Sequence, residues 1–282
     1  MKRKVILIVL AVLALAIFGI FYGSVRWLKI YDHVLYFDNL PSHLEGLRIL
    51  HISDLHSNNP NRMNIDIWRH IDNLEFDIAV ITGDIVLDPR YTTYNFFEML
   101  EAHRHGFAAL AARVPTFFVE GNHEADYFHQ TSQFMDEVGI TFLFNDHIFL
   151  PVGGGHLEII GTPDYITLSR NRHLDAEFDR LFENIGGGFQ LVLTHQPQIF
   201  DRIKDSGINL VLAGHTHGGQ IRLPFFPTLY APNQGFFPRY GAGFYTHNDA
   251  VMYVSRGIGT TYFPFRFWNR PEIAVIELRS AD

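Results

Sequence analysis

Residues 210–217 read LVLAGHTH, an apolar run that ends in a pair of histidines, His215 and His217. Successive apolar residues without polar alternation are typical of a strand that is buried on both faces. The two histidines are two positions apart, so their side chains point the same way in an extended segment. This stretch predicts a buried strand of a parallel sheet that carries two imidazoles at its carboxyl end.

Four other polar pieces of the chain follow apolar runs in the same way. The runs predict strands over residues 47–52, 78–82, 115–119 and 189–194. Sites in open α/β sheets form beyond the carboxyl ends of the strands, so we expect the polar pieces to meet there. The pieces are Asp54-Leu55-His56, Gly83-Asp84, Gly121-Asn122-His123-Glu124 and His195.

Together the five pieces supply carboxylates, one amide oxygen and several imidazoles. This mixture suits a pair of divalent metal ions such as manganese, iron or zinc. For any one of these histidines alone, a structural role would be the better hypothesis. The order of all five pieces, each at the end of a strand, favours a metal site. The pieces use five of the 16 histidines, and we interpret the others as surface or structural residues; His103 and His105 are expected to be solvated.

The order and spacing of the pieces resemble the calcineurin-like metallophosphoesterase superfamily over about residues 47–278. Segments 214–220 and 255–259 are similar to a membrane-linked bacterial branch of YaeI/YkuE-like phosphodiesterases. The resemblance implies an α/β fold in which two packed β-sheets are flanked by α-helices. It also implies a hydrolase that contains two divalent metal ions and acts on phosphoric ester bonds.

The resemblance implies that one acidic residue is shared by the two ions. One ion is expected to bind Asp54, His56, Asp84 and His217. The other ion is expected to bind Asp84, Asn122, His195 and His215.

The resemblance assigns His123 to chemistry rather than to metal binding. In the family this residue faces the phosphate and stabilises or protonates the leaving oxygen. Histidine is a side-chain type suited to proton donation near neutral pH. Hydrolysis is then expected to proceed by two-metal activation of water, without a covalent enzyme intermediate.

Helices are expected between the strands. Alternation of strands and helices in the first half predicts parallel strands with crossover connections. The predicted helices cover residues 64–74, 94–112, 130–138 and 173–182, and further strands are predicted near residue 148 and over 157–160, 251–255 and 273–278.

Length and composition favour a single large catalytic domain. The chain has 282 residues, a net charge of -8 and no cysteine, and no linker divides it. The acidic balance, with no basic run beyond residues 2–4, indicates that nucleic acid is not a partner. The absence of cysteine excludes a disulfide framework and leaves the compartment open. We assign residues 1–30 to a membrane anchor and residues 41–282 to the catalytic domain.

Residues 5–22 form an unbroken run of apolar residues and glycine, near the lower limit for spanning a bilayer. More basic residues precede the run than closely follow it, which favours a cytoplasmic N-terminus. We therefore predict a single-pass protein of the cell membrane with an extracytoplasmic catalytic domain. Trp27, Tyr31 and Tyr36 suit the membrane interface beyond such an anchor. A cleaved signal peptide is the rival interpretation, but the apolar run is longer than a typical signal core.

Aromatic segments at 225–227, 236–238 and 262–268 follow the last proposed ligands. They are interpreted either as core packing under a long loop or as an apolar rim that touches lipid. Four arginines interleave with them and could contact a phosphate or headgroup. These are Arg222, Arg239, Arg256 and Arg266.

The aromatic segments and the anchor lead to the hypothesis that the substrate is a membrane-associated phosphodiester or pyrophosphate. A UDP-diacylglucosamine-like lipid is one candidate, although it would be met on the cytoplasmic side, against the predicted orientation. A phosphomonoesterase is the first alternative, because the same ligand set serves both reactions. A non-catalytic scaffold of the same fold is the second, and a nuclease is disfavoured by the acidic charge and the anchor. The native metal pair and the oligomeric state stay open.

Overall fold

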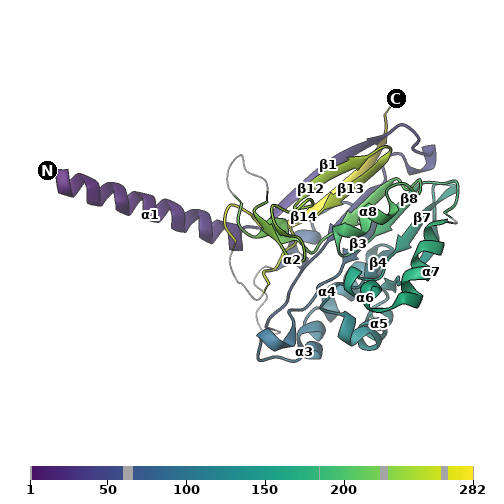
Figure 1. Cartoon of the computed structure of the whole chain (residues 1–282), viewed down its shortest axis with the longest axis horizontal. Helices are drawn as coiled ribbons and strands as arrows, with labels where there is room; N and C mark the ends of the chain where they lie inside the picture. Colours follow the sequence, from purple (N-terminus) through teal and green to yellow (C-terminus); the bar gives the residue numbers. More distant parts are fainter. Residues whose placement is uncertain (1, 60–65, 184, 223–227, 262–265, 282) are drawn as a thin grey trace.

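Alternating buried strands and helices build two six-stranded β-sheets that pack against each other, with helices on both outer faces (Figure 1). The computed structural model describes residues 2–59, 66–183, 185–222, 228–261 and 266–281. This architecture confirms the predicted α/β fold of two packed sheets flanked by helices.

The first sheet has the strand order β1-β14-β2-β3-β4-β5. Strands β2 to β5 run parallel to one another, as their crossover connections predict, while β14 runs antiparallel to β2. The strands are β1 (Lys29–Phe37), β2 (Arg48–Ile52), β3 (Ile78–Thr82), β4 (Thr116–Val119), β5 (Thr141–Phe142) and β14 (Glu272–Ser280).

The second sheet has the order β12-β13-β9-β8-β7-β6, with four parallel strands in the middle and one antiparallel strand at each edge. A separate short pair consists of β10 (Tyr230–Ala231) and β11 (Gly235–Phe236). The strands of the second sheet are β6 (Asp146–Val152), β7 (Gly155–Gly161), β8 (Gln190–Leu193), β9 (Leu210–Ala213), β12 (Gly243–His247) and β13 (Ala250–Val254).

Eight α-helices and five short 3-10 helices are present in the described part of the chain. The α-helices are α1 (Lys2–Arg26), α2 (Ile67–Ile71), α3 (Phe96–Glu101), α4 (Arg104–Arg113), α5 (Phe128–Glu137), α6 (Tyr165–Arg170), α7 (Arg172–Glu183) and α8 (Phe200–Ile203). The 3-10 helices are η1 (Ser42–Leu44), η2 (Pro89–Tyr91), η3 (Ala125–Tyr127), η4 (Pro197–Ile199) and η5 (His217–Gly219).

The single helix predicted over residues 94–112 is two helices, α3 and α4. The N–H of His103 bonds to the carbonyl of Leu100, three residues back, and this tighter turn separates them. His103 is buried against the rings of Trp68 and Phe107, so the expectation that it is solvated is wrong. Its neighbour His105 is exposed, as expected.

Apolar side chains form three layers around the two sheets. Between the sheets, Val80 of β3 and Leu193 of β8 belong to one fully buried cluster. On the outer face of the first sheet, Phe118 of β4 packs in a cluster with Phe107 of α4. The outer face of the second sheet is covered in the same way by helices α7 and α8. The interior therefore fixes both sheets rigidly behind the loops at their carboxyl ends.

Strand β1 was not predicted from the sequence. It pairs in parallel with β14 over nine positions, from Lys29 opposite Glu272 to Phe37 opposite Ser280. The strand lies largely between the two segments assigned to the anchor and the catalytic domain, and it places Tyr31 and Tyr36 on the first sheet.

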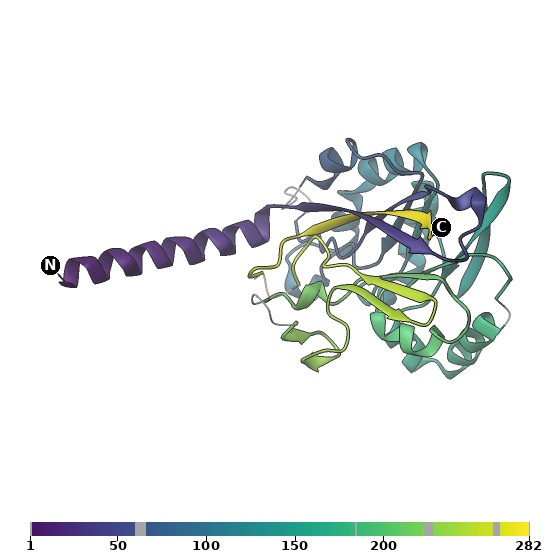
Figure 2. The same ribbon diagram turned by 90° about the horizontal axis from the view of Figure 1, so that it is seen from above.

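Helix α1 projects away from the two sheets (Figures 1 and 2). Its segment Arg3–Ser24 has 22 residues and is long and apolar enough to cross a membrane. Only two residues, Trp27 and Leu28, separate the helix from β1. The domain is therefore joined directly to the candidate membrane span.

Parts of the predicted aromatic segments lie outside the described residues. These parts are residues 225–227 and 262–265, and the first two residues of the predicted helix 64–74 also lie outside. Of the remaining aromatic residues, Phe236 and Phe237 are strongly exposed, at 78% and 69%.

Candidate metal centre

The site is built by loops that follow β2, β3, β4, β8 and β9, at the carboxyl ends of these strands. The loop backbones adopt left-handed conformations, which are uncommon for residues other than glycine and concentrate at functional sites. The residues with positive φ include Asp54 (52°), His56 (42°), Asp84 (54°), His215 (70°) and His217 (49°). Tight turns thus bring polar side chains from both sheets to one place.

Asp54, His56 and His217 form the first cluster. The Nε2 atoms of His56 and His217 lie 2.9 Å apart. The Oδ1 atom of Asp54 lies 3.3 Å from His217 Nε2 and 3.8 Å from His56 Nε2. All three side chains are buried, so three potential ligand atoms converge out of contact with bulk water.

Asp84, His195 and His215 form the second cluster. His195 Nε2 lies 3.1 Å from His215 Nδ1 and 3.3 Å from Asp84 Oδ2. The other ring nitrogen of His195, Nδ1, donates to the carbonyl of Thr82 at 2.7 Å, which directs Nε2 into the cluster. All three members of this cluster are also buried.

One oxygen of Asp84 joins the two clusters. Its Oδ2 atom lies 3.4 Å from His56 Nε2 in the first cluster and 3.3 Å from His195 Nε2 in the second. A carboxylate in this position can bind two cations at once and offset part of their repulsion.

Asn122 stands between two residues that touch Asp84. The backbone N–H of His123 donates to Asp84 Oδ1 at 3.0 Å, and a Cβ added to Gly121 would meet the same oxygen. The Oδ1 atom of Asn122 is buried and has no hydrogen-bond partner among the described residues. A buried amide oxygen without a partner is energetically costly, so this atom needs a hydrogen-bond donor or a cation as its partner.

The electrostatics of the second cluster favour an ion pair when no cation is present. Burial would raise the pKa of Asp84, but the positive charges of His123 and His195 hold it well below its ordinary value. Burial would lower the pKa of His195, but the Asp84 carboxylate raises it well above its ordinary value. Burial and the charge of His195 lower the pKa of His215 to about 3, so that ring is neutral. Binding of a cation would therefore release a proton from this cluster.

The donor set fits divalent metals. Nitrogen ligands lie at about 2.0–2.1 Å from zinc, so two ligands at a tetrahedral angle are separated by roughly 3.3 Å. The separations within the two clusters, 2.9–3.8 Å, bracket this value. Carboxylate, imidazole and amide ligands together suit manganese, iron or zinc.

His123 differs from the four other histidines of the site because it is partly exposed. Its Nδ1 atom contacts the carbonyl of Val86 at 2.9 Å, so Nδ1 carries the proton. Its Nε2 atom lies 3.8 Å from Asp84 Oδ2, and its ring lies 4.7 Å from that of His56. The imidazole thus borders both clusters from the more open side.

The sequence did not predict the roles of several supporting residues. Glu124 is fully buried and accepts hydrogen bonds from the backbone N–H groups of Asp84, Ile85 and Gly121. Its place at the end of the quoted piece Gly121-Asn122-His123-Glu124 was a usable signal. The carboxylate holds the loops after β3 and β4 together.

Other supporting residues come from distant parts of the chain. The Asn233 side chain lies 3.2 Å from His215 Nε2, and Asn269 donates to the carbonyl of His217 at 2.5 Å. Arg266, one of the arginines expected near a headgroup, is fully buried and lies 3.2 Å from His217 Nδ1. Its guanidinium donates to backbone carbonyls at Arg256 and Gly257. No local pattern in the sequence marks these contacts.

The close approach of two loops requires glycine at position 83. Gly83 has a φ of +80°, and a Cβ built there would lie 2.3 Å from the backbone nitrogen of Gly121. A side chain would force the loops after β3 and β4 apart.

Several known proteins are similar to this chain in sequence. The Bacillus subtilis metallophosphoesterase YkoQ is 30% identical over 84% of this chain and 84% of its own. The metallophosphoesterase YkuE, also from Bacillus subtilis, is 28% identical over 93% of this chain and 91% of its own. The Escherichia coli phosphodiesterase YaeI is 28% identical over 91% of this chain and 90% of its own. Residues 47–219 match the family described as calcineurin-like phosphoesterase, and the chain therefore belongs to that family.

Proposed function

We propose that this chain is a membrane-anchored phosphodiesterase with a two-metal centre. Family membership makes it a hydrolase of phosphoester bonds. The observation that carries the proposal is the position of Asp84 Oδ2 between two buried groups of metal-ligand atoms. A centre of this kind serves hydrolysis of a phosphoester by water.

The two clusters would hold one metal ion each, with Asp84 shared. When bound, two such ions activate a water molecule and neutralise charge on the phosphoryl oxygens. The unpartnered Oδ1 of Asn122 supports its assignment to the second site. The first ion would bind Asp54, His56, Asp84 and His217, and the second would bind Asp84, Asn122, His195 and His215.

His123 would protonate the leaving oxygen. Its Nδ1 proton is held by the carbonyl of Val86, so Nε2 is the nitrogen that faces the site. Its partial exposure allows contact with a substrate that enters from outside, and the four buried histidines lack this access. A group placed in this way is a general acid.

The substrate would be a phosphodiester or pyrophosphate held in or near a membrane. Helix α1 and the strongly exposed Phe236 and Phe237 support a location at lipid. Lys2, Arg3 and Lys4 before the apolar run would keep the N-terminus in the cytoplasm and place the catalytic domain outside it.

The test uses the full chain in detergent micelles, stripped of metal and reloaded with manganese. We expect bis-p-nitrophenyl phosphate to be hydrolysed faster than p-nitrophenyl phosphate, with both rates dependent on the metal. Asp84→Asn should lose metal and activity, whereas Asp136→Asn, at an exposed position of α5, should lose neither.

Faster cleavage of the monoester would replace the proposal with a phosphomonoesterase. A folded chain that binds two metals and cleaves neither compound would favour a scaffold.

A further inference from the structure

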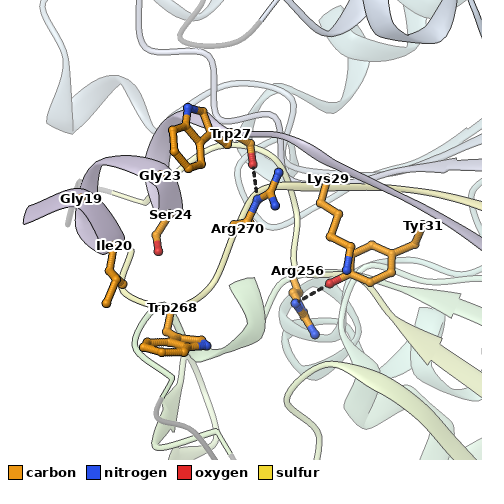
Figure 3. Close-up of a pocket in the computed structure, with 10 residues that line it drawn as sticks. All are labelled: Gly19, Ile20, Gly23, Ser24, Trp27, Lys29, Tyr31, Arg256, Trp268 and Arg270. Carbon is orange, nitrogen blue, oxygen red and sulfur yellow. Dashed lines mark hydrogen bonds between the residues drawn. The ribbon is translucent and has the colours of Figure 1, made fainter. Parts of the chain in front are cut away.

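A cavity of about 350 Å³ lies where helix α1 meets the catalytic domain (Figure 3). The end of α1, the start of β1 and the segment around Trp268 surround it. It is separate from the two clusters of the metal centre, and none of their residues lines it.

Three basic side chains converge on this cavity, namely Lys29, Arg256 and Arg270. Arg270 donates to the backbone carbonyls of Trp27 at 2.8 Å and Leu28 at 3.2 Å. These partners are neutral, so the charge of Arg270 is not compensated by an ion pair to a carboxylate in the described part of the chain.

The other two cations contact one aromatic side chain, that of Tyr31. Lys29 Nζ is 4.1 Å from the centre of the Tyr31 ring, and Arg256 donates to the Tyr31 hydroxyl at 2.8 Å. Glu272 lies 3.5 Å from Arg256 and offsets one positive charge. The cavity therefore keeps an excess of positive charge, which matches an anionic ligand.

The opposite wall of the cavity is apolar and belongs to the candidate membrane span. Gly19, Ile20 and Gly23 present the surface of α1, and Trp27 and Trp268 flank it. Both tryptophans are about half exposed. Tryptophan is enriched where proteins cross the boundary between hydrocarbon and water. One ligand could thus place a charged group and an apolar chain in the same cavity.

The length of α1 places the cavity at the level of lipid headgroups. The candidate span of 22 residues ends at Ser24. At 1.5 Å per residue it rises about 33 Å, close to the roughly 30 Å thickness of a hydrocarbon core. A cavity that begins at this end of the helix would lie among headgroup phosphates.

We propose that this cavity binds an anionic phospholipid, with the phosphate beside Lys29, Arg256 and Arg270 and an acyl chain along α1. The proposal rests on membrane insertion of α1 and does not require hydrolytic activity. The bound lipid is a positioning ligand and not the substrate, because the metal ligands lie elsewhere.

The cavity is nevertheless connected to the metal centre through one short segment. Trp268 and Arg270 line the cavity, whereas Asn269 between them donates to the carbonyl of His217. The side chain of Arg256 also lies next to Gly218, where an added Cβ would be 3.1 Å from it. A lipid in the cavity would therefore stabilise the loop that carries His217 and fix its orientation toward the bilayer.

Native mass spectrometry of the full chain in detergent micelles tests the proposal. Phosphatidylglycerol and phosphatidylcholine with the same acyl chains are added at equal concentrations, and the bound lipids are counted. We expect at least fivefold more retained phosphatidylglycerol. The double variant Lys29→Glu/Arg270→Glu should bind both lipids equally, whereas Arg170→Glu/Arg172→Glu, on the distant helices α6 and α7, should keep the preference.

Two further variants keep the test decisive if the double variant does not fold. Lys29→Gln, at an exposed position, should reduce the preference at least twofold. Arg270→Lys should retain it, because the positive charge stays even though the hydrogen bonds to the carbonyls of Trp27 and Leu28 are weakened. Loss of preference in Arg270→Lys would indicate a purely structural role for Arg270 and overturn the proposal.

Three other results would also overturn the proposal. These are equal retention of the two lipids by the natural chain, an equal loss in the Arg170/Arg172 variant, and displacement by equimolar glycerol phosphate, which would indicate a soluble ligand. The measurement uses metal-free protein, so a failure of the proposed hydrolase function would leave its outcome unchanged.

Discussion

The carboxylate of Glu124 accepts a hydrogen bond of 2.8 Å from the backbone N–H of Asp84, forty positions earlier in the chain. The same oxygen accepts from Gly121 at 2.9 Å, and the second oxygen accepts from Ile85. Burial and the neighbouring Asp84 raise the pKa of Glu124 to about 7. A buried acid thus fixes the backbone that presents the carboxylate shared by both clusters.

Glu124→Gln should weaken metal binding by about 10–100-fold, which is typical for residues that orient ligands. The amide oxygen of glutamine can accept hydrogen bonds from the backbone N–H groups that face it. The NH₂ group would face the remaining N–H donors and could not accept from them. Isothermal titration of the metal-free chain with manganese measures this effect. Glu137→Gln, at an exposed position of α5, is the control and should bind as the natural chain does. Unchanged affinity in Glu124→Gln would show that the loops hold their geometry without this carboxylate.

His123→Ala should lower kcat by about 10²–10⁴-fold while the chain retains its metals. The reason is that His123 is partly exposed and is assigned to chemistry, although it also lies within ligand distance of His56 and Asp84. Hydrolysis of bis-p-nitrophenyl phosphate and metal content are measured together. His129→Ala, on the exposed face of α5, serves as the control. Loss of a metal ion from His123→Ala would instead make this residue a ligand.

Gly83→Ala should destabilise the fold by at least about 2 kcal/mol, because alanine is strained at this positive φ and its Cβ meets backbone. Gly187→Ala is a suitable comparison, since a Cβ at that position would have nothing within 4 Å. Its effect should stay within about 0.5 kcal/mol. Urea unfolding measures the free energy of unfolding of both variants. Equal stabilities would mean that the loops after β3 and β4 separate without cost.

His103 should make stability depend on pH. Burial lowers its pKa to about 4 from an ordinary value of 6.5. Its contribution is fully present above pH 6.5 and is lost as the pH falls toward 4, because the unfolded chain binds the proton first. The difference between these two pKa values corresponds to about 3 kcal/mol of unfolding free energy.

The loss of unfolding free energy between pH 6.5 and pH 4 should therefore be smaller in His103→Gln than in the natural chain, by up to about 3 kcal/mol. His105→Gln, at an exposed position of α4 two residues later, should behave as the natural chain does. Denaturant unfolding at several pH values measures the difference. Parallel curves for His103→Gln and the natural chain would show that the buried ring does not control this pH dependence.

A chain that begins at Pro41 should aggregate, whereas one that begins at Trp27 should stay monodisperse without α1. Removal of β1 exposes the edge of β14, which β1 covers over nine paired positions. Long unpaired edges pair with other chains. Size-exclusion chromatography distinguishes the two outcomes. Equal behaviour would show that β1 is dispensable for the first sheet.

The central strands could be predicted because they are continuous apolar runs that end at polar residues. Residues 78–82 and 210–213 match β3 and β9 in full. Strand β1 was missed because it alternates polar and apolar residues directly after the apolar run, so its tyrosines were assigned to a membrane interface. Its partner β14 is more than 240 positions away, and no local pattern reveals that pairing.

The ligand-type residues could be found because they stand at strand ends, where the fold concentrates them. The structure brings Asp54, Asp84 and the predicted histidines of the site together, while the roles assigned to them stay predictions. The complete burial of Arg266 was not predicted, because an arginine among aromatic residues gives no sign that it is buried. Contacts such as that between Asn233 and His215 depend on loop paths that local sequence does not encode.

With α1 in a membrane, the two-residue connection between α1 and β1 would determine how the proposed enzyme searches for its substrate. A hydrolase on a long flexible linker samples a large volume of solvent. This domain would instead be held close to the bilayer surface by the short connection. Its encounters would then be set by diffusion in two dimensions within a thin layer above the lipid. Inserting ten glycine and serine residues after Leu28 would let the domain move away from the bilayer and search the solvent as well. It would not alter any residue of the site.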